Sequence, residues 1–349
     1  MTATAATTAD PVTTLDLGPA RALSCRECGA TVPLGPHYAC ADCFGPLEVA
    51  YEFGKITRET IAAGPRSIWR YRGLLPVPSN VQETRNLEPG GTPLVRADNL
   101  ARELGMRALW VKDDSANPTH SFKDRVVAVA LAAARELGFS TLACPSTGNL
   151  ANAVAAAAAR AGIRSVVLIP ADLEQQKIVT TAVYGGTLVA VEGTYDDVNR
   201  VASELAGEHE DWAFVNVNVR PYYAEGSKTL GFEVAEQLGW RLPHQVVIPV
   251  ASGSQLTKVD KAFGELGSLG LVEESPYRIF GAQATGAHRW RRRSRPGMTS
   301  CDRSGPRPSP SRWRSATRPT GRTCSTLCAA PAGRSRTSPT TRSSRASGC

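Results

Sequence analysis

Apolar residues in the middle of the chain occur in short unbroken runs, and these runs alternate with alanine-rich stretches. Runs rich in Val and Ile predict β-strands that are buried on both faces. We expect strands at residues 109–113, 141–146, 165–170, 187–193, 213–218, 245–252 and 278–284. The stretches 124–138 and 150–162 predict helices between strands, because their composition favours helix and each ends at a glycine.

This alternation predicts an α/β fold with parallel sheets that helices cover on both faces, in a doubly wound arrangement. A chain of 349 residues has room for two core-forming domains and a small module. Ligands in folds of this kind bind beyond the carboxyl ends of the strands. The loops that follow the predicted strands are therefore the places to search for a site.

Two Cys-x-x-Cys turns lie near the N-terminus, at Cys25 and Cys28 and again at Cys40 and Cys43. Each turn directs two thiolates to one point, and two turns complete a tetrahedral site of sulfurs that is closed to water. The pattern predicts a structural Zn²⁺ in a zinc-ribbon-like module over residues 21–50. A rubredoxin-type iron centre, and cysteines that bind no metal, are the alternatives.

The net charge of +8 arises at the end of the chain. Residues 288–349 contain 15 Arg and one Asp, so they carry +14 and leave −6 for residues 1–287. The first part therefore has the acidic balance of an ordinary globular protein. The last part, rich in Arg, Ser and Pro, has too few apolar residues to form a core and is expected to be disordered. An Arg-rich arm that binds nucleic acid is one interpretation of it.

The segment 117–125, NPTHSFKDR, places a lysine, an aspartate and an arginine at the start of the first alanine-rich helix. One interpretation is an ordinary helix start, with Thr119 or Ser121 as the cap and the three charges facing solvent. The other is that Lys123 forms a Schiff base with an aldehyde cofactor. The segment by itself leaves both interpretations open.

Two further loops join a predicted strand to a predicted helix through small residues. They are STGN, at residues 146–149, and ASGSQ, at residues 251–255. Backbone N–H groups at such helix starts can bind an anion, although helix capping alone is the simpler explanation of the first loop. The second loop matches neither GxGxxG nor the P-loop pattern, so dinucleotide and nucleoside triphosphate binding lose support.

Several segments together resemble threonine synthase, which belongs to the fold-type II group of pyridoxal-phosphate enzymes with the serine/threonine dehydratases and tryptophan synthase β. These segments are SIWRYRGLLPV (67–77), PGGTPLVRA (89–97), NPTHSFKDR (117–125), STGNLANA (146–153), NVNVRPYYAEGSKTLGFEVAEQLG (216–239) and VASGSQLTK (250–258). The likeness extends from about Cys25 to Gly286. It implies a tryptophan synthase β-like catalytic region over 51–287, with a smaller domain at about 130–230 inserted in the larger one.

The resemblance implies a role for each matching residue. Lys123 would hold pyridoxal 5'-phosphate as a Schiff base and then shuttle protons on the substrate, and Asn149 would hydrogen-bond the phenolic oxygen of the cofactor. Ser146 and Thr147 would meet the carboxylate or the phosphate of the substrate. The residues that would hold the cofactor phosphate are Ala251, Ser252, Gly253, Ser254 and Gln255.

The reaction implied by the resemblance converts O-phospho-L-homoserine and water to L-threonine and phosphate, a step of threonine biosynthesis. The leaving group needs a second phosphate site, and the candidates are Lys112, Asn218 and Arg220, since each lies near the carboxyl end of a strand. Arg220 suits bidentate binding of phosphate, but a surface arginine is an equally good interpretation. Glu225 and Lys228 could equally form an ion pair on a helix surface.

Other functions remain open at this point. Within the same chemistry they are cysteate synthase and a serine or threonine dehydratase, since pocket residues rather than the fold select the substrate. A zinc-dependent nucleic-acid-binding protein with an Arg-rich tail is the alternative from another class. We favour an enzyme with a small-molecule substrate and with neither nucleic acid nor membrane as a partner. A homodimer is one candidate for its assembly.

The N-terminal residues 1–20 lack the basic and apolar regions of a secretory signal, and we expect them to be disordered. No apolar run is long enough to cross a membrane. We therefore expect a cytoplasmic protein.

A shifted reading frame is a second interpretation of residues 288–349. Codons for residues 314–326 can be chosen so that the offset frame reads IGNPADGPYVLD, which resembles the family segment that follows GAQATG (281–286). Two other segments of the tail allow ordinary α/β sequences in the same frame. We therefore expect a frameshift near Ala287, in the gene or in its sequencing, and an incomplete cofactor domain with reduced or no activity.

Overall fold

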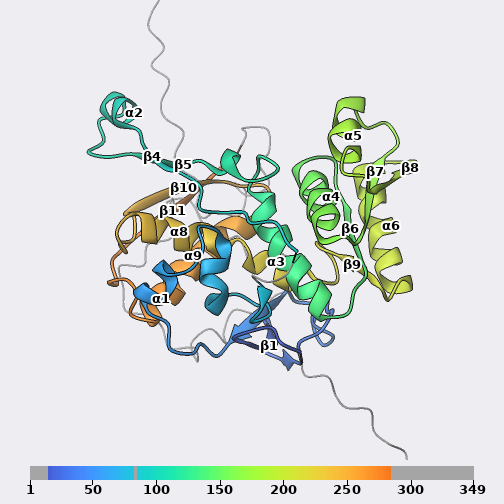
Figure 1. The fold of residues 1–349 in the computed structure, drawn as a ribbon, viewed down its shortest axis with the longest axis horizontal. Helices are drawn as coiled ribbons and strands as arrows, with labels where there is room; N and C mark the ends of the chain where they lie inside the picture. The colour runs from blue at the N-terminus through green and yellow to red at the C-terminus, as the bar shows by residue number, and fades with distance from the viewer. Residues whose placement is uncertain (1–14, 82–84, 284–349) are drawn as a thin grey trace, which may run out of the picture.

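A computed structural model describes residues 15–81 and 85–283, which form layers of helices and sheets around a central helix (Figure 1). The Arg-rich segment 288–349, for which disorder and a shifted frame are predicted, lies outside these residues. None of the described helices combines the length and the apolar composition that crossing a membrane requires.

The first strands form a small antiparallel sheet in the order β2-β1-β3. They are β1 (Ala20–Cys25), β2 (Thr31–Val32) and β3 (Leu47–Tyr51). These strands and the loops between them are called the N-terminal module. The two Cys-x-x-Cys turns lie within it, and its inner side packs on the rest of the protein through buried residues such as Leu23 and Val49.

The segment before β1 is ordered from residue 15 onwards. The side chain of Leu17 is buried in the core, and the backbone N–H of Asp16 donates to the carboxylate of Glu136 at 2.6 Å. The prediction of disorder up to residue 20 is therefore wrong for residues 15–20, because an apolar side chain and a long-range hydrogen bond fix them. Residues 1–14 lie outside the described residues.

A parallel sheet in the order β8-β7-β6-β9 occupies the middle of the chain, as the alternation of strands and helices predicted. Its strands are β6 (Thr141–Pro145), β7 (Arg164–Pro170), β8 (Thr187–Val191) and β9 (Trp212–Phe214). Its helices are α4 (Asn149–Ala161), α5 (Gln175–Ala182) and α6 (Tyr195–Glu208). Successive residues of β6 point to opposite faces, so Cys144 packs in the cluster with α4 and Ala143 in the cluster with α6.

Two pairs of strands lie apart from this sheet. β10 (Gln245–Pro249) and β11 (Arg278–Ala282) are parallel, as predicted. β4 (Leu94–Arg96) and β5 (Trp110–Lys112) are antiparallel, so the prediction of a parallel strand at 109–113 is wrong. The connection between them contains only the short helix α2 (Asp98–Glu103), which is too short to cross a sheet face and bring β5 back in parallel.

The remaining helices are α1 (Arg58–Ala62), α7 (Arg220–Glu225), α8 (Lys228–Gln237) and α9 (Ser254–Ser268). Of these, α8 and α9 lie beside the pair β10–β11 (Figure 1), and Glu225 of α7 contacts Tyr51 of the N-terminal module. Two short 3₁₀ helices, η1 (Ile68–Leu74) and η3 (Asp114–Ala116), precede the central helix in the sequence. How the catalytic region divides into a larger and a smaller domain stays a prediction.

The central helix is α3 (Lys123–Glu136), which runs between the four-stranded sheet and helices α8 and α9 (Figure 1). Every residue from Asp124 to Ala134 is buried. Val126 and Val127 pack toward α4 and β6, whereas Ala128 and Val129 pack toward η1 and α8. Small side chains let neighbours approach α3 from all sides, so its first turn, which carries Lys123, is held firmly.

Candidate active site

Lys123 is the first residue of α3, and its side chain is partly buried. The Nζ atom donates a hydrogen bond of 3.0 Å to the hydroxyl oxygen of Tyr223, which lies on α7. No carboxylate of the described residues forms an ion pair with it. Lys112, Lys228, Lys258 and Lys261 differ, because each of these lysines pairs with at least one glutamate. Among these five lysines, Lys123 is therefore the one whose amine is not paired with a carboxylate of the described residues and could react with an aldehyde.

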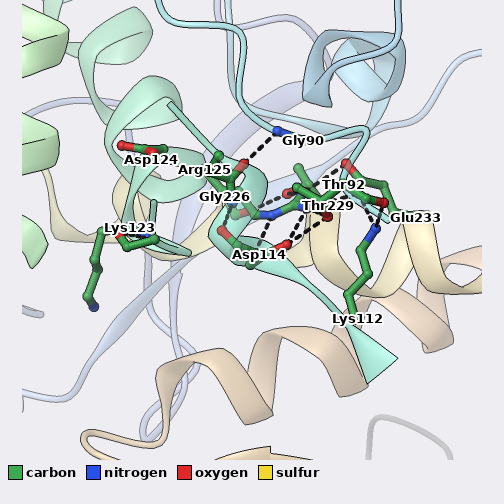
Figure 2. A network of polar contacts seen from close by, with 12 residues as sticks. Gly90, Thr92, Lys112, Asp114, Lys123, Asp124, Arg125, Gly226, Thr229 and Glu233 are labelled. Carbon is green, nitrogen blue, oxygen red and sulfur yellow. Dashed lines mark hydrogen bonds and ion pairs between the residues drawn. The ribbon is translucent and has the colours of Figure 1, made fainter. Parts of the chain in front are cut away.

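Arg125, two residues further along α3, lies at the centre of a buried network of charges (Figure 2). Its Nε and Nη2 atoms donate to the carboxylate of Asp114 at 2.7 and 2.8 Å. Its Nη1 and Nη2 atoms donate to the carboxylate of Glu233 at 2.7 and 2.9 Å. Hydroxyl groups of Thr92 and Thr229 accept further bonds. The network joins the start of α3 to η3, α8 and the loop before β4.

This arrangement contradicts the interpretation that the charges of NPTHSFKDR face solvent. Arg125 and Asp124 are both fully buried. Asp124 accepts hydrogen bonds from the backbone N–H and the hydroxyl of Thr119, at 2.7 and 2.6 Å. Figure 2 shows the side chain of Lys123 pointing away from the Arg125 network. Asp124 and Arg125 therefore hold the first turn of α3 in place, and the amine of Lys123 lies on the opposite side of that turn.

Charge pairing keeps the Glu233 carboxylate ionised in the interior. Burial alone would raise the pKa of Glu233, but the charge of Arg125, followed by that of Lys112, outweighs this effect and lowers the pKa to about 2. The same pairing holds the pKa of Arg125 above its ordinary value, although burial opposes it. The network is thus a compensated set of buried ions whose members depend on one another.

Two glycines of the PGGTPL segment let the backbone approach this network. Gly90 and Gly91 both have positive φ, +92° and +62°. Their N–H groups donate to Asn117 and to Glu233, each at 2.9 Å. A Cβ atom on Gly91 would lie 2.3 Å from the carbonyl oxygen of Arg66, so a side chain is excluded there.

The loop 146–149 has the features of an anion-binding helix start. Gly148, at the N-cap of α4, has an extended and non-helical backbone, and no side chain caps the helix. A Cβ atom at Gly148 would meet nothing within 4 Å among the protein atoms, so the loop borders open space. Ser146 is buried, whereas Asn149 is exposed and its side chain has no hydrogen bond within the described residues. The N–H of Ser146 donates to the carbonyl of Leu168 at 3.1 Å, and the N–H of Gly148 donates to the hydroxyl of Ser146 at 3.4 Å. Within the described residues, the N–H of Thr147 and the side chain of Asn149 are therefore among the groups of this loop that remain free to contact a ligand.

The loop 251–255 leads into α9 in a similar way. Gly253, at the N-cap, has a φ of +85°, which favours glycine, and no side chain caps the helix. Ala251 and Ser252 are exposed, and Ser254 and Gln255 are half-buried. The turn thus exposes successive backbone N–H groups at the start of a long helix, as binding of a phosphate requires.

The three candidates for the substrate phosphate differ in their surroundings. Lys112 Nζ donates to Thr92, Glu233 and Gln237, at 2.7, 2.7 and 2.9 Å. Its three protons are therefore all used within the protein (Figure 2).

Asn218 is occupied as well, because its side chain accepts from the N–H of Phe214 and donates to the carbonyl of Trp212. Strand β9 ends at Phe214, before the predicted residue 218. Arg220 is exposed, and its guanidinium has no partner in the described part of the chain. Of the three candidates, Arg220 is therefore the one whose donors are free for a phosphate in the described part of the chain.

Tyr223 was not predicted to belong to the site. Its hydroxyl meets Lys123 across a separation of 100 residues, so no local pattern could indicate the contact. The only signal in the sequence was the family-like segment PYYAEGSK, in which either tyrosine could have been chosen. The hydroxyl of Tyr222, in contrast, bonds the backbone of Gly35 in the N-terminal module.

Glu225 holds α7 in place from the inside of the protein. It is fully buried and pairs with Lys228, Lys258 and Lys261, at 2.9, 2.5 and 3.0 Å. Burial would raise its pKa, but these three charges, led by Lys228, hold the pKa well below its ordinary value. The interpretation of Glu225 and Lys228 as a surface pair is therefore wrong, because both side chains are fully buried and Lys228 also contacts Leu74 and Glu265.

The thiols of Cys25, Cys28, Cys40 and Cys43 lie within 4.8 Å of one another. Cys25 Sγ is 3.4 Å from Cys43 Sγ, and Cys28 Sγ is 3.7 Å from Cys40 Sγ. A tetrahedral metal with bonds of about 2.3 Å to sulfur has sulfur–sulfur edges of about 3.8 Å. The donor set and its dimensions therefore fit a single tetrahedral metal ion.

Comparison with known families places this site in a defined class. The family described as "Pyridoxal-phosphate dependent enzyme" matches residues 86–322. The chain therefore belongs to the family of pyridoxal-phosphate-dependent enzymes. The matched range includes Lys123 and both helix-start loops, and it continues into the Arg-rich segment.

Curated relatives narrow the likeness further. The chain is 38% identical over 269 residues to threonine synthase of Methanosarcina acetivorans. This alignment covers 76% of this chain and 65% of the relative. It is 35% identical over 268 residues to threonine synthase of Methanocaldococcus jannaschii, with 75% and 65% covered. The chain thus spans 65% of the length of these two relatives.

Solved structures agree on the fold. The processed form of threonine deaminase isoform 2 from Solanum lycopersicum matches with a TM-score of 0.50 at 25% identity, over 60% of this chain and 53% of that one. An L-serine ammonia-lyase from Rhizomucor miehei matches with a TM-score of 0.50 at 20% identity, over 58% and 62%. Both likenesses support the α/β fold of this chain.

Proposed function

We propose that this chain carries the active site of a threonine synthase, which converts O-phospho-L-homoserine and water to L-threonine and phosphate. The observation that carries the proposal is the amine of Lys123, which starts α3, faces a tyrosine hydroxyl and has no carboxylate partner in the described residues. The similarity to threonine synthases at 35–38% identity supports this substrate. The fold would be that of the fold-type II group, like tryptophan synthase β.

The residues present fit pyridoxal phosphate at three places. Lys123 would hold its aldehyde covalently, and Asn149 would reach its phenolic oxygen. The uncapped start of α9, with Gly253 at its N-cap, would bind its phosphate through backbone N–H groups. When bound, this cofactor supplies an electron sink for a carbanion on the substrate.

The chain itself would supply orientation and proton transfer. Ser146 and Thr147, with the N–H of Thr147 and the first N–H groups of α4, would bind the substrate carboxylate. Lys123 Nζ, once released, would move protons at the carbon atoms next to the reacting bonds. The hydroxyl of Tyr223 would hold that nitrogen in position, and Arg220 would bind the phosphate that leaves.

We also propose that the four cysteines bind Zn²⁺ in a zinc-ribbon-like site. Thiolate ligands and a closed tetrahedron favour zinc, and such a site stabilises a short segment without taking part in catalysis. The N-terminal module contacts α7 and α9, so a metal that stabilises the module would also stabilise these two helices beside the active site.

The test is a comparison of the unchanged chain with Lys123→Ala. With pyridoxal phosphate, the unchanged chain is expected to show a visible absorption band that borohydride reduction removes, and the variant is expected to show none. Lys177→Ala, which alters a surface lysine paired with Glu174, is the matched control and should keep the band. Phosphohomoserine should then yield phosphate and threonine in equal amounts. A colourless unchanged chain that is folded would contradict the proposal.

A dehydratase is the second candidate, because the solved structures that share the fold include a threonine deaminase and a serine ammonia-lyase. Its products differ, since a dehydratase releases ammonia and a 2-oxo acid from serine or threonine. Formation of those products, without phosphate release from phosphohomoserine, would select the dehydratase.

A further inference from the structure

A pocket of about 150 Å³ lies where the N-terminal module meets α7 and the start of α9. The module contributes Arg26, Tyr38 and Glu48 to its lining, α7 contributes Arg220, and α9 contributes Lys258. Ser252, Gly253 and Ser254, from the loop that would hold the cofactor phosphate, line it as well. Residues far apart in the sequence thus surround one small space.

The charges in this lining favour an anion. Arg26, Arg220 and Lys258 supply three positive charges, and Glu48 supplies one negative charge. A single oxygen of Glu48 accepts from Arg26 Nη1 at 3.2 Å and from Lys258 Nζ at 2.9 Å. Lys258 also pairs with the buried Glu225 at 2.5 Å, so its charge is compensated within the protein, and the two arginines carry the excess positive charge of the pocket. In the part of the chain that the structure describes, the other N–H groups of Arg26 and the whole guanidinium of Arg220 have no partner.

The metal-binding turn fixes the position of Arg26. This residue lies between Cys25 and Cys28, and its backbone N–H donates to the carbonyl of Pro46 at 3.1 Å. The N–H of Gly29 closes the same turn on the carbonyl of Cys25, also at 3.1 Å. The direction of the Arg26 side chain therefore depends on the geometry of the cysteine site.

The pocket is also linked to Lys123 through α7. Arg220 and Tyr223 are three residues apart on this helix, so their side chains lie on neighbouring positions of one face. Arg220 lines the pocket, and Tyr223 contacts Lys123. A phosphorylated ligand attached to, or reacting at, Lys123 would have its phosphate directed along this face.

We propose that Arg26 binds a phosphate monoester together with Arg220, so that the N-terminal module forms one wall of the ligand pocket. The inference rests on the function proposed above and extends it to a residue outside the catalytic region. The phosphate could belong to the cofactor or to the substrate, and the chemistry that recognises it is the same in both cases. Bidentate guanidinium contacts are the strongest side-chain interactions for this group.

The direct test measures binding of inorganic phosphate to the metal-loaded chain by calorimetry, without any cofactor. Arg26→Gln is expected to weaken binding about tenfold, as loss of one charge-assisted contact does. Arg26→Lys should recover only part of it. The matched control is Arg21→Gln, in the same module, because Arg21 forms an exposed pair with Glu52 at 3.2 Å and does not line the pocket. Equal phosphate binding by Arg26→Gln and the control would overturn the inference.

Two further arms identify the source of the phosphate. If it is the phosphate of the cofactor, Arg26→Gln weakens binding of pyridoxal phosphate, followed by its absorption band, and leaves binding of pyridoxal unchanged. If it is the phosphate of the substrate, both aldehydes bind normally, and the KM for phosphohomoserine rises about tenfold with kcat nearly unchanged. Equal weakening of pyridoxal and pyridoxal phosphate would indicate a merely structural role and would overturn the inference.

These arms separate the inference from the proposed function. If the chain forms no coloured adduct at all, the proposed function fails, but the calorimetric comparison of Arg26→Gln with Arg21→Gln still decides whether the pocket binds phosphate. If the adduct forms and none of the phosphate measurements changes, the inference fails alone.

Discussion

The Nζ atom of Lys123 lies 3.0 Å from the hydroxyl oxygen of Tyr223, and these two residues come from helices α3 and α7. The helices are held by different buried networks. Arg125 fixes the start of α3 through Asp114 and Glu233, and Glu225 fixes α7 through three lysines. The contact therefore joins two firmly held helices, and it defines the position of the Lys123 amine.

Removal of this contact should impair the reaction without unfolding the protein. We expect Tyr223→Phe to form the coloured adduct with pyridoxal phosphate but to lower kcat at least about tenfold, since a positioned hydrogen bond to the reacting nitrogen is lost. The pH profile of kcat should shift as well, because the partner of the amine has changed.

The matched control is Tyr222→Phe, which removes the neighbouring hydroxyl from Gly35 and leaves the one at Lys123 in place. Its kcat and pH profile should stay close to those of the unchanged chain. A Tyr223→Phe variant with unaltered kcat would show that the contact has no part in the reaction.

Acid should destabilise the fold through Glu233. Its pKa is about 2 in the folded protein against an ordinary value of 4.5, so the unfolded chain binds the proton more readily. The stabilisation is complete above about pH 4.5 and is lost as the pH falls toward about 2, by about 3 kcal/mol in total.

Urea unfolding at several pH values measures this effect. Glu233→Gln is expected to be less stable at neutral pH, because Arg125 loses one of its two carboxylate partners. The variant is also expected to lose less stability than the unchanged chain on acidification. Glu204→Gln is the control, since Glu204 is exposed and pairs only with Arg200 on the surface of α6. If Glu233→Gln and the control respond to acid in the same way, the assigned pKa is wrong.

Metal removal should loosen the N-terminal module and the helix that it contacts. We expect one zinc ion per chain, and we expect Cys28→Ser or a strong chelator to remove it. The midpoint of thermal unfolding should fall by at least about 4 °C, which corresponds to about 1–2 kcal/mol for a protein of this size.

Cys144→Ala provides the control for loss of a thiol, because Cys144 is buried in β6, away from the cluster. It should retain the metal. Retention of one zinc ion by Cys28→Ser at full affinity would exclude the four-sulfur site.

Restoration of the reading frame after about residue 287 should raise the solubility and the activity of the protein. Val247 in β10 is 68% exposed, and Val111 in β5 is 46% exposed, so apolar strand faces lack cover in the described structure. A frame-restored chain is expected to bind less of a hydrophobic dye, to be more soluble and to have higher threonine synthase activity. Resequencing that returns the printed frame, together with soluble and fully active protein, would refute the frameshift hypothesis.

The sequence predicted those parts of the site that depend on neighbours along the chain. Lys123 was proposed from the family-like segment NPTHSFKDR, and the loops before α4 and α9 were proposed because a strand, a small-residue turn and a helix follow one another locally. Their roles stay predictions. The cysteine cluster was equally local, since two knuckles suffice to gather four thiols. The antiparallel pairing of β5 was missed because it depends on the length of one connection.

Long-range contacts determined the rest. Lys112 is an unremarkable lysine at a strand end in the sequence, but in the fold Glu233 and Gln237 use its protons. Tyr223 and Arg26 could not be assigned from the sequence either. Tyr223 contacts Lys123 across 100 residues of the sequence, and Arg26 lines the same pocket as Arg220, which is still further away in the sequence.

The sequence by itself determined the α/β class and the four-cysteine cluster, and it indicated the lysine on which the proposed chemistry depends, because periodicity and short motifs act over a few residues. Only the tertiary structure decided which charges are buried and which remain free for a ligand. The physical reason is that burial and ion pairing are properties of the packed interior: Arg125 and Glu233 neutralise each other there, and Lys123, on the opposite side of the same turn, does not meet a carboxylate of the described residues.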